Sequence, residues 1–208
     1  MKIRADYNTA LIVQELERIF HGKCYLCEQA QLSDPEIEHF KPHLNDKALK
    51  NDWNNLYYSC SRCNSIKGAT HVDLLDCCNP NVDVFKSIKI VLPTIPDDDI
   101  IVTPSNHLNK NEVNTASLVS LCYNDRKTGL RGITRSSLME KLQAEYLHIA
   151  ILTHTILNKK STPTKITEAK ESIEVMLQDD YPFSAVWKWY VLGHSALQRR
   201  APELTQSL

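Results

Sequence analysis

Residues 24–68 read CYLCEQAQLSDPEIEHFKPHLNDKALKNDWNNLYYSCSRCNSIKG. The stretch holds two Cys-x-x-Cys pairs, Cys24 with Cys27 and Cys60 with Cys63, and the second pair begins 33 positions after the first ends. Four thiolates in two clips of this spacing build a closed, tetrahedral zinc site. The separation is longer than in a plain zinc ribbon, so a further segment must loop out between the clips. We therefore predict a structural zinc site that holds the two ends of this segment together.

Polar side chains follow one another in a defined order within and after this loop. Glu38 and His39 lie on a predicted short strand, an Asn-Leu step follows at Asn55, and Asn64 belongs to a Cys-x-x-Cys-Asn-x-x-Lys sequence that opens a predicted helix. In this order the motifs resemble those of the HNH endonucleases. The resemblance covers about a quarter of the chain. It implies the ββα-metal fold, in which two short strands and a helix carry a nuclease site.

Hydrolysis of a phosphodiester needs a nucleophilic water and a cation that offsets the negative charge of the transition state. His39 titrates near neutral pH, so we expect it to be the general base that takes a proton from the water. Glu38 and Asn64 offer oxygen ligands to a hard divalent cation such as Mg²⁺. The resemblance gives Asn55 the role of positioning His39. The family often has Asp in place of Glu38 and His in place of Asn64, which leaves the preferred metal open.

A zinc-stapled binding module without catalysis is the alternative to a nuclease. Such a module, contacting nucleic acid or another protein, accounts for the four cysteines of the two clips. It does not explain why a carboxylate, a histidine and two asparagines occur together at the spacing found in a known family of nucleases. We therefore predict an enzyme, a phosphodiester hydrolase, rather than a binding module.

The formal net charge of the chain is −1. This is unusual for a nuclease, because affinity for nucleic acid comes mainly from Lys and Arg side chains that neutralise phosphates. Either the positive charge is localised or a partner holds the substrate. Residues 125–141 carry a local surplus of cations, which a solvated helix face explains nearly as well. For Arg62 and Lys67 a salt bridge is as good an interpretation as a phosphate contact. The candidate nucleic-acid contacts are Lys41, Arg62, Lys67, Arg126, Arg131 and Arg135.

Cysteine usage bears on the compartment. The chain has seven cysteines and begins without an apolar leader, which favours a reducing compartment where thiolates bind metal. No apolar run reaches the roughly 18 residues that a membrane helix needs. We therefore expect a cytoplasmic protein that is neither exported nor inserted in a membrane. The cysteines outside the two clips, Cys77, Cys78 and Cys122, are predicted to be small buried apolar residues.

The hydrophobic pattern predicts an α+β fold with two parts. Residues 1–75 are expected to form a zinc-stapled ββα-metal HNH core, and residues 76–208 a mainly helical accessory or interaction region. Residues 47–52 are expected to be a polar loop. Strands are predicted over 36–40, 56–59, 88–92 and 100–103, and helices over 9–20, 61–67, 116–123, 136–157, 164–177 and from 184 onward as one segment.

A narrower resemblance rests on GKCYLCE, IEHFKP, DWNNLYYSCSRCNSIKG, LLDCCNP and VNTASLVSLCYNDRKTGLR. These runs are similar to the PtuB-like HNH subunit of Septu-type bacterial anti-phage systems, a group also found with some retrons. The resemblance implies a DNA endonuclease of antiviral defence and a partner, a PtuA-like ABC-type ATPase subunit, which residues 76–208 are expected to dock. Relatives associated with retrons imply RNA, including tRNA, as the alternative substrate. A ββα-metal site acts on the phosphate rather than the base, so the sequence leaves both substrates open.

Overall fold

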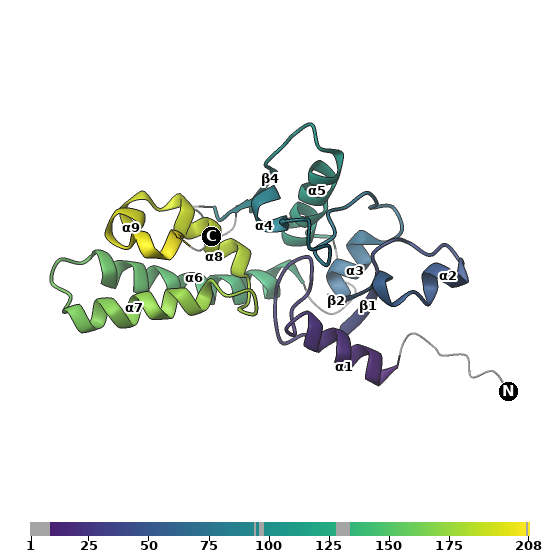
Figure 1. Ribbon diagram of the computed structural model, residues 1–208, viewed down its shortest axis with the longest axis horizontal. Helices are drawn as coiled ribbons and strands as arrows, with labels where there is room; N and C mark the ends of the chain where they lie inside the picture. Colours follow the sequence, from purple (N-terminus) through teal and green to yellow (C-terminus); the bar gives the residue numbers. More distant parts are fainter. Residues whose placement is uncertain (1–8, 94, 96–97, 128–133, 207) are drawn as a thin grey trace.

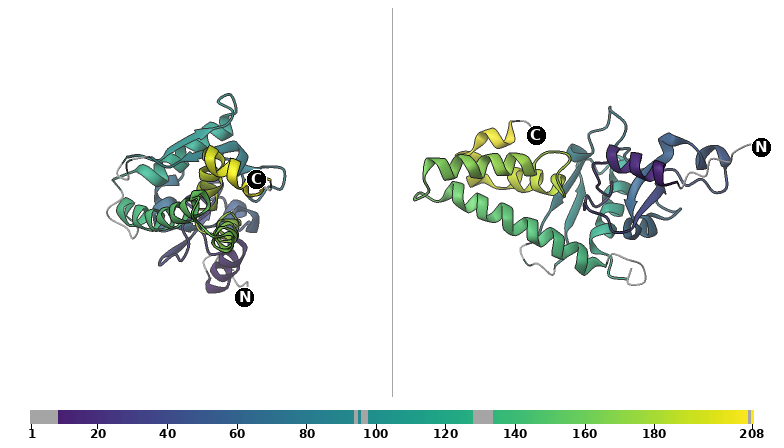
Figure 2. Two further views of the ribbon diagram at one scale, coloured as in Figure 1. Left: turned by 90° about the vertical axis from the view of Figure 1, so that its left-hand side faces the viewer. Right: turned by 90° about the horizontal axis from the view of Figure 1, so that it is seen from below.

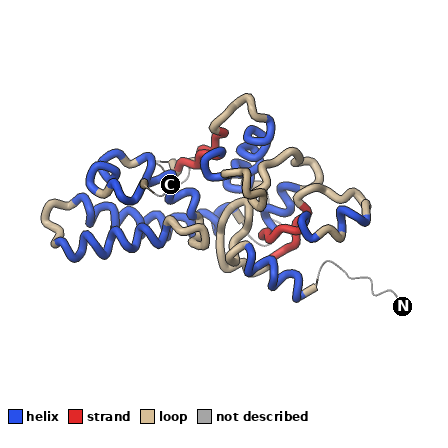
Figure 3. Tube along the Cα trace, viewed as in Figure 1, coloured by secondary structure: helices blue, strands red, loops and turns tan. Residues whose placement is uncertain are grey.

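The computed structural model describes residues 9–93, 95, 98–127, 134–206 and 208. It is elongated, with the zinc-clip region at one end and a helical body at the other (Figure 1). Its strands form two separate two-stranded sheets, and helices make up most of the rest (Figure 3). The predicted α+β fold, with a ββα region first and a helical part after it, is confirmed. Of the candidate nucleic-acid contacts, Arg131 lies outside the described residues.

The ββα unit forms as predicted. Strand β1 (Pro35–His39) pairs antiparallel with β2 (Leu56–Cys60), and Glu38 lies opposite Tyr57 in the register. Helix α3 (Ser61–Lys67) follows β2 directly. Because the strand ends where the helix begins, the last residue of β2 and the first turn of α3 belong to the same Cys-x-x-Cys clip. The second clip therefore stands at the junction between the small sheet and the helix.

Helix α1 (Ala10–Ile19) packs against this small sheet. The hydroxyl of Thr9 caps its first turn, as expected of a threonine before an apolar-periodic run. Leu16 is buried and packs in a small apolar cluster with Leu56 and Tyr58 of β2. Leu16, with Ile12 and Val13 beside it, thus forms the face that joins α1 to the ββα unit.

Residues 47–52 were expected to be a polar loop, and for the first four of them this is wrong. They form a short helix, α2 (Lys47–Lys50), and a 3-10 turn, η1 (Trp53–Asn55), follows it. The reason lies in two aspartates. Asp46 accepts a hydrogen bond from the backbone N–H of Ala48 at 2.7 Å, and Asp52 caps η1 in the same way. Each cap satisfies backbone donors that short helices otherwise leave open.

A second hairpin follows the connector after α3. Short helix α4 (Val84–Ser87) leads into β3 (Ile88–Val91), which pairs antiparallel with β4 (Ile101–Pro104). The predicted strand pair is confirmed.

Helix α5 (Lys110–Asn124) begins six residues before the predicted start at 116. Asn109 caps it, accepting from the N–H groups of the first turn. Thr115 precedes the predicted start and, as a threonine, favours a cap there, but it lies inside the helix, and its hydroxyl accepts a hydrogen bond from the backbone N–H of Leu75 at 2.8 Å. The Thr115 hydroxyl therefore makes a hydrogen bond to a distant segment and does not cap a helix.

The helical body is built from the last 70 or so residues. The longest helix, α6, and α7 run side by side in every view, and α8 and α9 pack over them (Figures 1 and 2). The segment from 184 onward was expected to be one helix; it breaks at His194, whose ring accepts from the N–H of Leu197 and so caps a new helix. The elements are α6 (Arg135–Leu157), α7 (Pro163–Met176), α8 (Ser184–Gly193), α9 (Ser195–Arg200) and the 3-10 turn η2 (Pro202–Thr205).

One apolar cluster runs through both predicted parts. It includes the four clip cysteines together with residues of the helical body such as Trp187, which is fully buried. Tyr123 of α5 is also fully buried, and its hydroxyl donates to the backbone carbonyl of Cys27 at 3.0 Å. The boundary at residue 75 remains a prediction, and the core is continuous across it. Among the helices that the structure describes, none is both long and apolar enough to cross a membrane.

Candidate active site

The sulfur atoms of Cys24, Cys27, Cys60 and Cys63 all lie within 4.8 Å of one another. Within the described part of the chain, no other His, Cys, Asp and Glu side chains gather in this way. A tetrahedral zinc ion with Zn–S bonds of about 2.3 Å holds its sulfurs about 3.8 Å apart, and the Cys27 and Cys60 sulfurs are 4.0 Å apart. All four side chains are fully buried. The cluster is able to bind structural zinc, as predicted.

Asn64 and Lys67 of α3 contact carboxylates of β1. Lys67 Nζ lies 2.7 Å from Glu38 Oε1 and 2.8 Å from the carbonyl oxygen of His39, and Lys67 is fully buried. Burial raises the pKa of Glu38 to about 7, because loss of hydration outweighs the neighbouring ammonium group. Lys67 is therefore a structural partner of the β1 carboxylate, and its burial removes it from the candidate nucleic-acid contacts.

A second carboxylate, Glu36, belongs to this group. Side chains alternate along a strand, so Glu36 and Glu38 share one face of β1. Asn64 Nδ2 donates to Glu36 Oε2 in a short hydrogen bond, one helical turn before the contact between Lys67 and Glu38. Three oxygen-bearing side chains, Glu36, Glu38 and Asn64, thus lie on the facing parts of β1 and α3, and oxygen atoms are the ligands that a hard divalent cation prefers. The sequence analysis did not single out Glu36; its place two residues before Glu38 is the signal that indicates it.

His39 lies at the end of β1 and is 8% exposed. Its Nε2 is 3.1 Å from the carbonyl oxygen of Lys50. A carbonyl only accepts, so Nε2 carries the proton of the neutral ring and Nδ1 is the basic nitrogen. Burial lowers the pKa of His39 below its ordinary value. The ring is therefore neutral at physiological pH, the protonation state that a general base requires.

Asn55 is 4% exposed and holds the loop beside His39. Its Oδ1 accepts from the backbone N–H of Lys41 at 2.7 Å, and its Nδ2 donates to the carbonyls of Lys41 at 2.9 Å and Leu49 at 3.0 Å. Three hydrogen bonds from one side chain thus join the start and the end of the loop whose Lys50 carbonyl holds the His39 ring. This geometry supports the positioning role predicted for Asn55.

His43 lies in the same loop and was not among the predicted site residues. Its ring centroid is 4.6 Å from that of His39, with 68° between the two planes. Its Nδ1 accepts from the backbone N–H of Asn45 at 3.1 Å. Two histidines of defined orientation therefore stand side by side at the end of β1.

Residues 24–70 match the family model of the HNH endonucleases. The chain contains an HNH endonuclease domain. Members of this family hydrolyse phosphodiester bonds, so nucleic acid is the substrate class and a catalytic divalent metal is implied. No curated protein and no solved structure matches the chain. The matched segment begins at the first clip cysteine and includes each of Glu38, His39, Asn55 and Asn64.

Arg62 joins the HNH domain to α5. It is 1% exposed, and its guanidinium donates to the backbone carbonyl of Cys122 at 3.0 Å and to that of Asp125 at 2.5 Å. A buried guanidinium with these partners does not face solvent, so the predicted contact with nucleic acid gives way to a structural role. Both cations of the α3 segment therefore serve the fold.

The remaining candidate contacts lie in different surroundings. Lys41 is exposed at the edge of the HNH domain and keeps its place as a candidate. Arg126 is exposed and lies 3.3 Å from Asp99. The Arg135 side chain is 13% exposed and donates to the carbonyl of Asp98 at 3.0 Å. The acidic residues before β4 thus face the two arginines, which reduces the positive charge available there to a polyanion.

Two of the three cysteines outside the zinc cluster are exposed, which corrects the sequence prediction. Cys122 is fully buried as expected, whereas Cys77 and Cys78 are exposed. The reason is a turn centred on Asp76. Its carboxylate accepts from the backbone N–H of Cys78 at 2.8 Å and, in a short hydrogen bond, from the hydroxyl of Tyr57. This arrangement fixes the backbone at the edge of the HNH domain and leaves both thiols outside the core.

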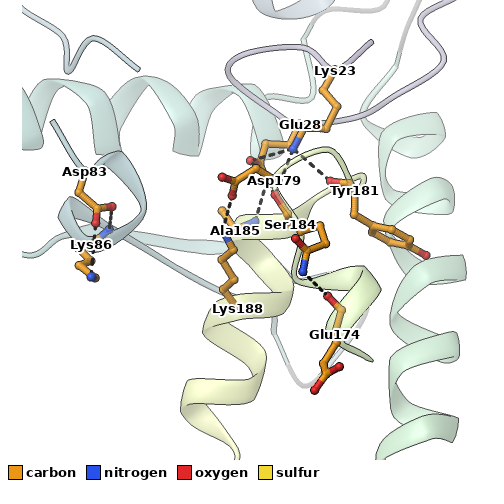
Figure 4. A network of polar contacts seen from close by, with 11 residues as sticks. Lys23, Glu28, Asp83, Lys86, Glu174, Asp179, Tyr181, Ser184, Ala185 and Lys188 are labelled. Carbon is orange, nitrogen blue, oxygen red and sulfur yellow. Dashed lines mark hydrogen bonds and ion pairs between the residues drawn. The ribbon is translucent and has the colours of Figure 1, made fainter. Parts of the chain in front are cut away.

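A groove of about 1180 Å³ lies between the first clip, the connector after α3 and helices α7 and α8. Figure 4 shows a polar network beside it: Lys23 donates to Ser184 Oγ at 3.1 Å, and Glu28 accepts from the backbone N–H of Ala185 at 2.9 Å. These contacts join the residues that flank the first clip to the start of α8. The four predicted catalytic residues lie outside the lining of this groove.

Proposed function

We propose that this chain is a metal-dependent endonuclease that cleaves DNA and serves as the nuclease effector of a bacterial anti-phage complex. The observation that carries the nuclease assignment is the hydrogen bond that orients the His39 ring at the end of β1, the strand that also carries Glu36 and Glu38. The Nε2 of His39 is tied to a backbone carbonyl, so the basic nitrogen of a neutral ring is Nδ1. The preference for DNA and the defence role rest on the resemblance to PtuB-like subunits.

In the proposed reaction His39 Nδ1 takes the proton of the attacking water. Asn55 keeps the loop that carries the Lys50 carbonyl in place, and this carbonyl holds the ring in its tautomer. Glu38 and Asn64 would hold a divalent cation such as Mg²⁺, with Glu36 beside them, and the cation would offset charge on the phosphate and the leaving oxygen. Because the zinc cluster includes Cys63, directly before Asn64, it fixes the start of the helix that carries this ligand.

Plasmid nicking by the purified protein, with and without Mg²⁺, tests this function. The wild type should nick DNA only with the metal, and His39→Ala should reduce the rate by about 10²–10⁴-fold with an unchanged fold. His148→Ala, at an exposed histidine of α6, is the matched control and should cleave at the wild-type rate. Equal cleavage by His39→Ala and the wild type would overturn the assignment of the base.

RNA is the second candidate substrate, because the phosphate chemistry of the site is common to both nucleic acids. The same preparation should therefore be incubated with total tRNA under the conditions of the nicking assay. Cleavage of tRNA in place of DNA would replace the proposed substrate and keep the catalytic assignment. No cleavage of either by a folded, zinc-loaded and Mg²⁺-supplied protein would favour the non-catalytic module.

Charge supports the proposed partner, an ABC-type ATPase subunit. The chain has a net charge of −1, and two cations of the HNH domain, Arg62 and Lys67, are buried. Phe183 and Trp187, large aromatic side chains of the helical body, pack inside the core and are not available to a partner. The proposal that residues 76–208 dock the ATPase therefore rests on the small number of cationic side chains available to bind phosphates. A partner subunit would supply further positive charge for binding nucleic acid.

Co-expression with the ATPase encoded by a neighbouring reading frame, followed by size-exclusion chromatography, tests the partner. Co-elution of the two proteins, with weak DNA binding by this chain alone, is the expected result. Separate elution together with tight, salt-sensitive DNA binding by this chain alone would count against the partner.

A further inference from the structure

The loop between β1 and α2 presents a second histidine to the candidate active site. His43 is half-buried, and its ring packs edge-on against the ring of His39. We propose that His43 contacts the scissile phosphodiester of the nucleic-acid substrate and donates a hydrogen bond from Nε2–H to a phosphate oxygen. This inference rests on the proposed nuclease function and assigns it a further catalytic residue.

Hydrogen bonding determines which nitrogen of His43 carries the proton. Nδ1 accepts from the backbone N–H of Asn45 at 3.1 Å, so the neutral ring is protonated at Nε2. Protonation of Nδ1 would break this bond. With Nδ1 occupied as an acceptor, Nε2–H is the donor that the ring offers. The oxygens of a phosphodiester accept hydrogen bonds only, and bonds between a donor and such an anion are among the stronger ones in proteins.

The backbone of the loop holds His43 in this orientation. Leu44 and Asn45 both have positive φ, 42° and 71°, although neither is glycine. A leucine in this region is strained, and such strain persists only where the surroundings fix the conformation. Leu44 is 77% exposed, so burial of its own side chain does not explain the conformation. The turn instead brings the N–H of Asn45 back to the His43 ring.

The position of His43 relative to the base defines what it can contact. Water activated by His39 must attack a phosphorus within reach of that ring, since a general base acts over a hydrogen-bond distance. His43, at 4.6 Å between ring centroids, stands beside the same reacting group. The ammonium group of Lys67 is bound to Glu38, so α3 offers no lysine contact to the substrate phosphate. The Nε2–H of His43 provides a hydrogen-bond donor to this phosphate instead.

Three substitutions separate hydrogen bonding from packing. His43→Gln places an N–H donor near the position of Nε2, His43→Asn places polar atoms near the position of Nδ1, and His43→Ala removes both. We expect kcat/KM for the nucleic acid that the wild type cleaves to fall by about 10- to 100-fold in His43→Ala and His43→Asn. His43→Gln should recover most of this loss. His148→Ala on α6 is the control, and thermal unfolding of all variants should match the wild type.

A spectroscopic measurement accompanies the kinetics. In protein labelled with ¹⁵N at histidine, the imidazole ¹⁵N–¹H correlations of His43 should show the Nε2–H tautomer. A short oligonucleotide added to the His39→Ala protein, which does not turn it over, should shift the Nε2–H signal.

Each outcome decides the inference. If His43→Ala cleaves at the wild-type rate, the proposed phosphate contact is overturned while the nuclease function stands. The same conclusion follows if His43→Gln is as impaired as His43→Ala. An Nδ1–H tautomer overturns it as well. Failure of the wild type to cleave any nucleic acid overturns the proposed function, and this inference falls with it.

Discussion

Cys78 is a nucleophilic thiol at the surface of the HNH domain. A hydrogen bond from Cys77 lowers the pKa of Cys78 to about 7, against the opposing effect of partial burial, and a contact with Tyr57 lowers it further. The same interaction raises the pKa of Cys77 well above its ordinary value. At neutral pH Cys78 is therefore partly ionised whereas Cys77 stays a thiol, and thiolates are the reactive form.

Alkylation by iodoacetamide should accordingly distinguish these neighbours. The rate at Cys78 should rise with pH as the thiolate forms, reach half its maximum at a pH of about 7 and then level off. Cys77 should react slowly over the same range. Peptide mass spectrometry of the intact and the Cys78→Ser proteins measures both rates. A midpoint near the ordinary thiol pKa of about 8.5 would contradict the hydrogen-bonded pair.

Among the elements, helix α3 shows which structural features could be predicted from the sequence and which could not. Its bounds were predicted from the second clip and the glycine after Lys67, because both signals are local. The burial of Arg62 and Lys67 could not be predicted from local signals. The partners of Arg62 lie at the end of α5, 60 and 63 residues later in the chain. The partners of Lys67 lie on β1, 29 and 28 residues earlier. Local patterns identify a cation, whereas only the packing of distant elements shows that it is buried.

The active-site loop illustrates the same limit. His39, Glu38 and Asn64 follow from motif order, and Glu36 follows from the two-residue period of a strand. The His39 tautomer depends on the Lys50 carbonyl, which is placed by a short helix that was expected to be loop. The hydrogen bond that orients His43 comes from Asn45, and Leu44 and Asn45 both adopt positive φ. Backbone conformations of this kind leave little trace in residue type.

The end of α3 yields a prediction for stability. Gly68 has φ 47° and ψ −148°, a conformation that residues with a Cβ rarely adopt. An added Cβ would meet only an ordinary contact at 3.9 Å, so the cost of Gly68→Ala is backbone strain, about 1–3 kcal/mol. Urea unfolding measures it.

Gly193→Ala is the matched control for this experiment. Gly193 ends α8 without positive φ, and nothing lies within 4 Å of an added Cβ. Alanine should there leave the free energy of unfolding unchanged or raise it by about 0.4–1 kcal/mol. Equal effects of the two substitutions would show that the conformation of Gly68 is not required.

At the scale of the whole molecule, the zinc cluster belongs to the core of both parts. Its cysteines pack in the same apolar cluster as the helical body, and Tyr123 and Arg62 bridge the two parts by hydrogen bonds. Loss of one zinc ligand should therefore destabilise the entire chain rather than the HNH domain alone.

Cys60→Ser tests this coupling, and Cys77→Ser, at an exposed cysteine, is its control. Elemental analysis should find one zinc per wild-type chain and none in Cys60→Ser, because structural zinc contributes directly to folding free energy. The urea midpoint should fall for far-UV circular dichroism and for tryptophan fluorescence together. Trp187 and Trp189 lie in α8, so in a Trp53→Phe background the fluorescence reports the helical body. Two separate transitions, or a stable folded protein without zinc, would contradict the shared core.

The contact between Lys23 and Ser184 also bears on the order in which the chain folds. The strands and clips of the HNH domain pair over short separations, whereas Lys23 and Ser184 are 161 residues apart. Contacts of low sequence separation form early, and those that close long loops form late. During synthesis the ββα unit can therefore assemble while α8 is still inside the ribosome. The residues around the first clip gain their final anchor only when nearly all of the chain has been made.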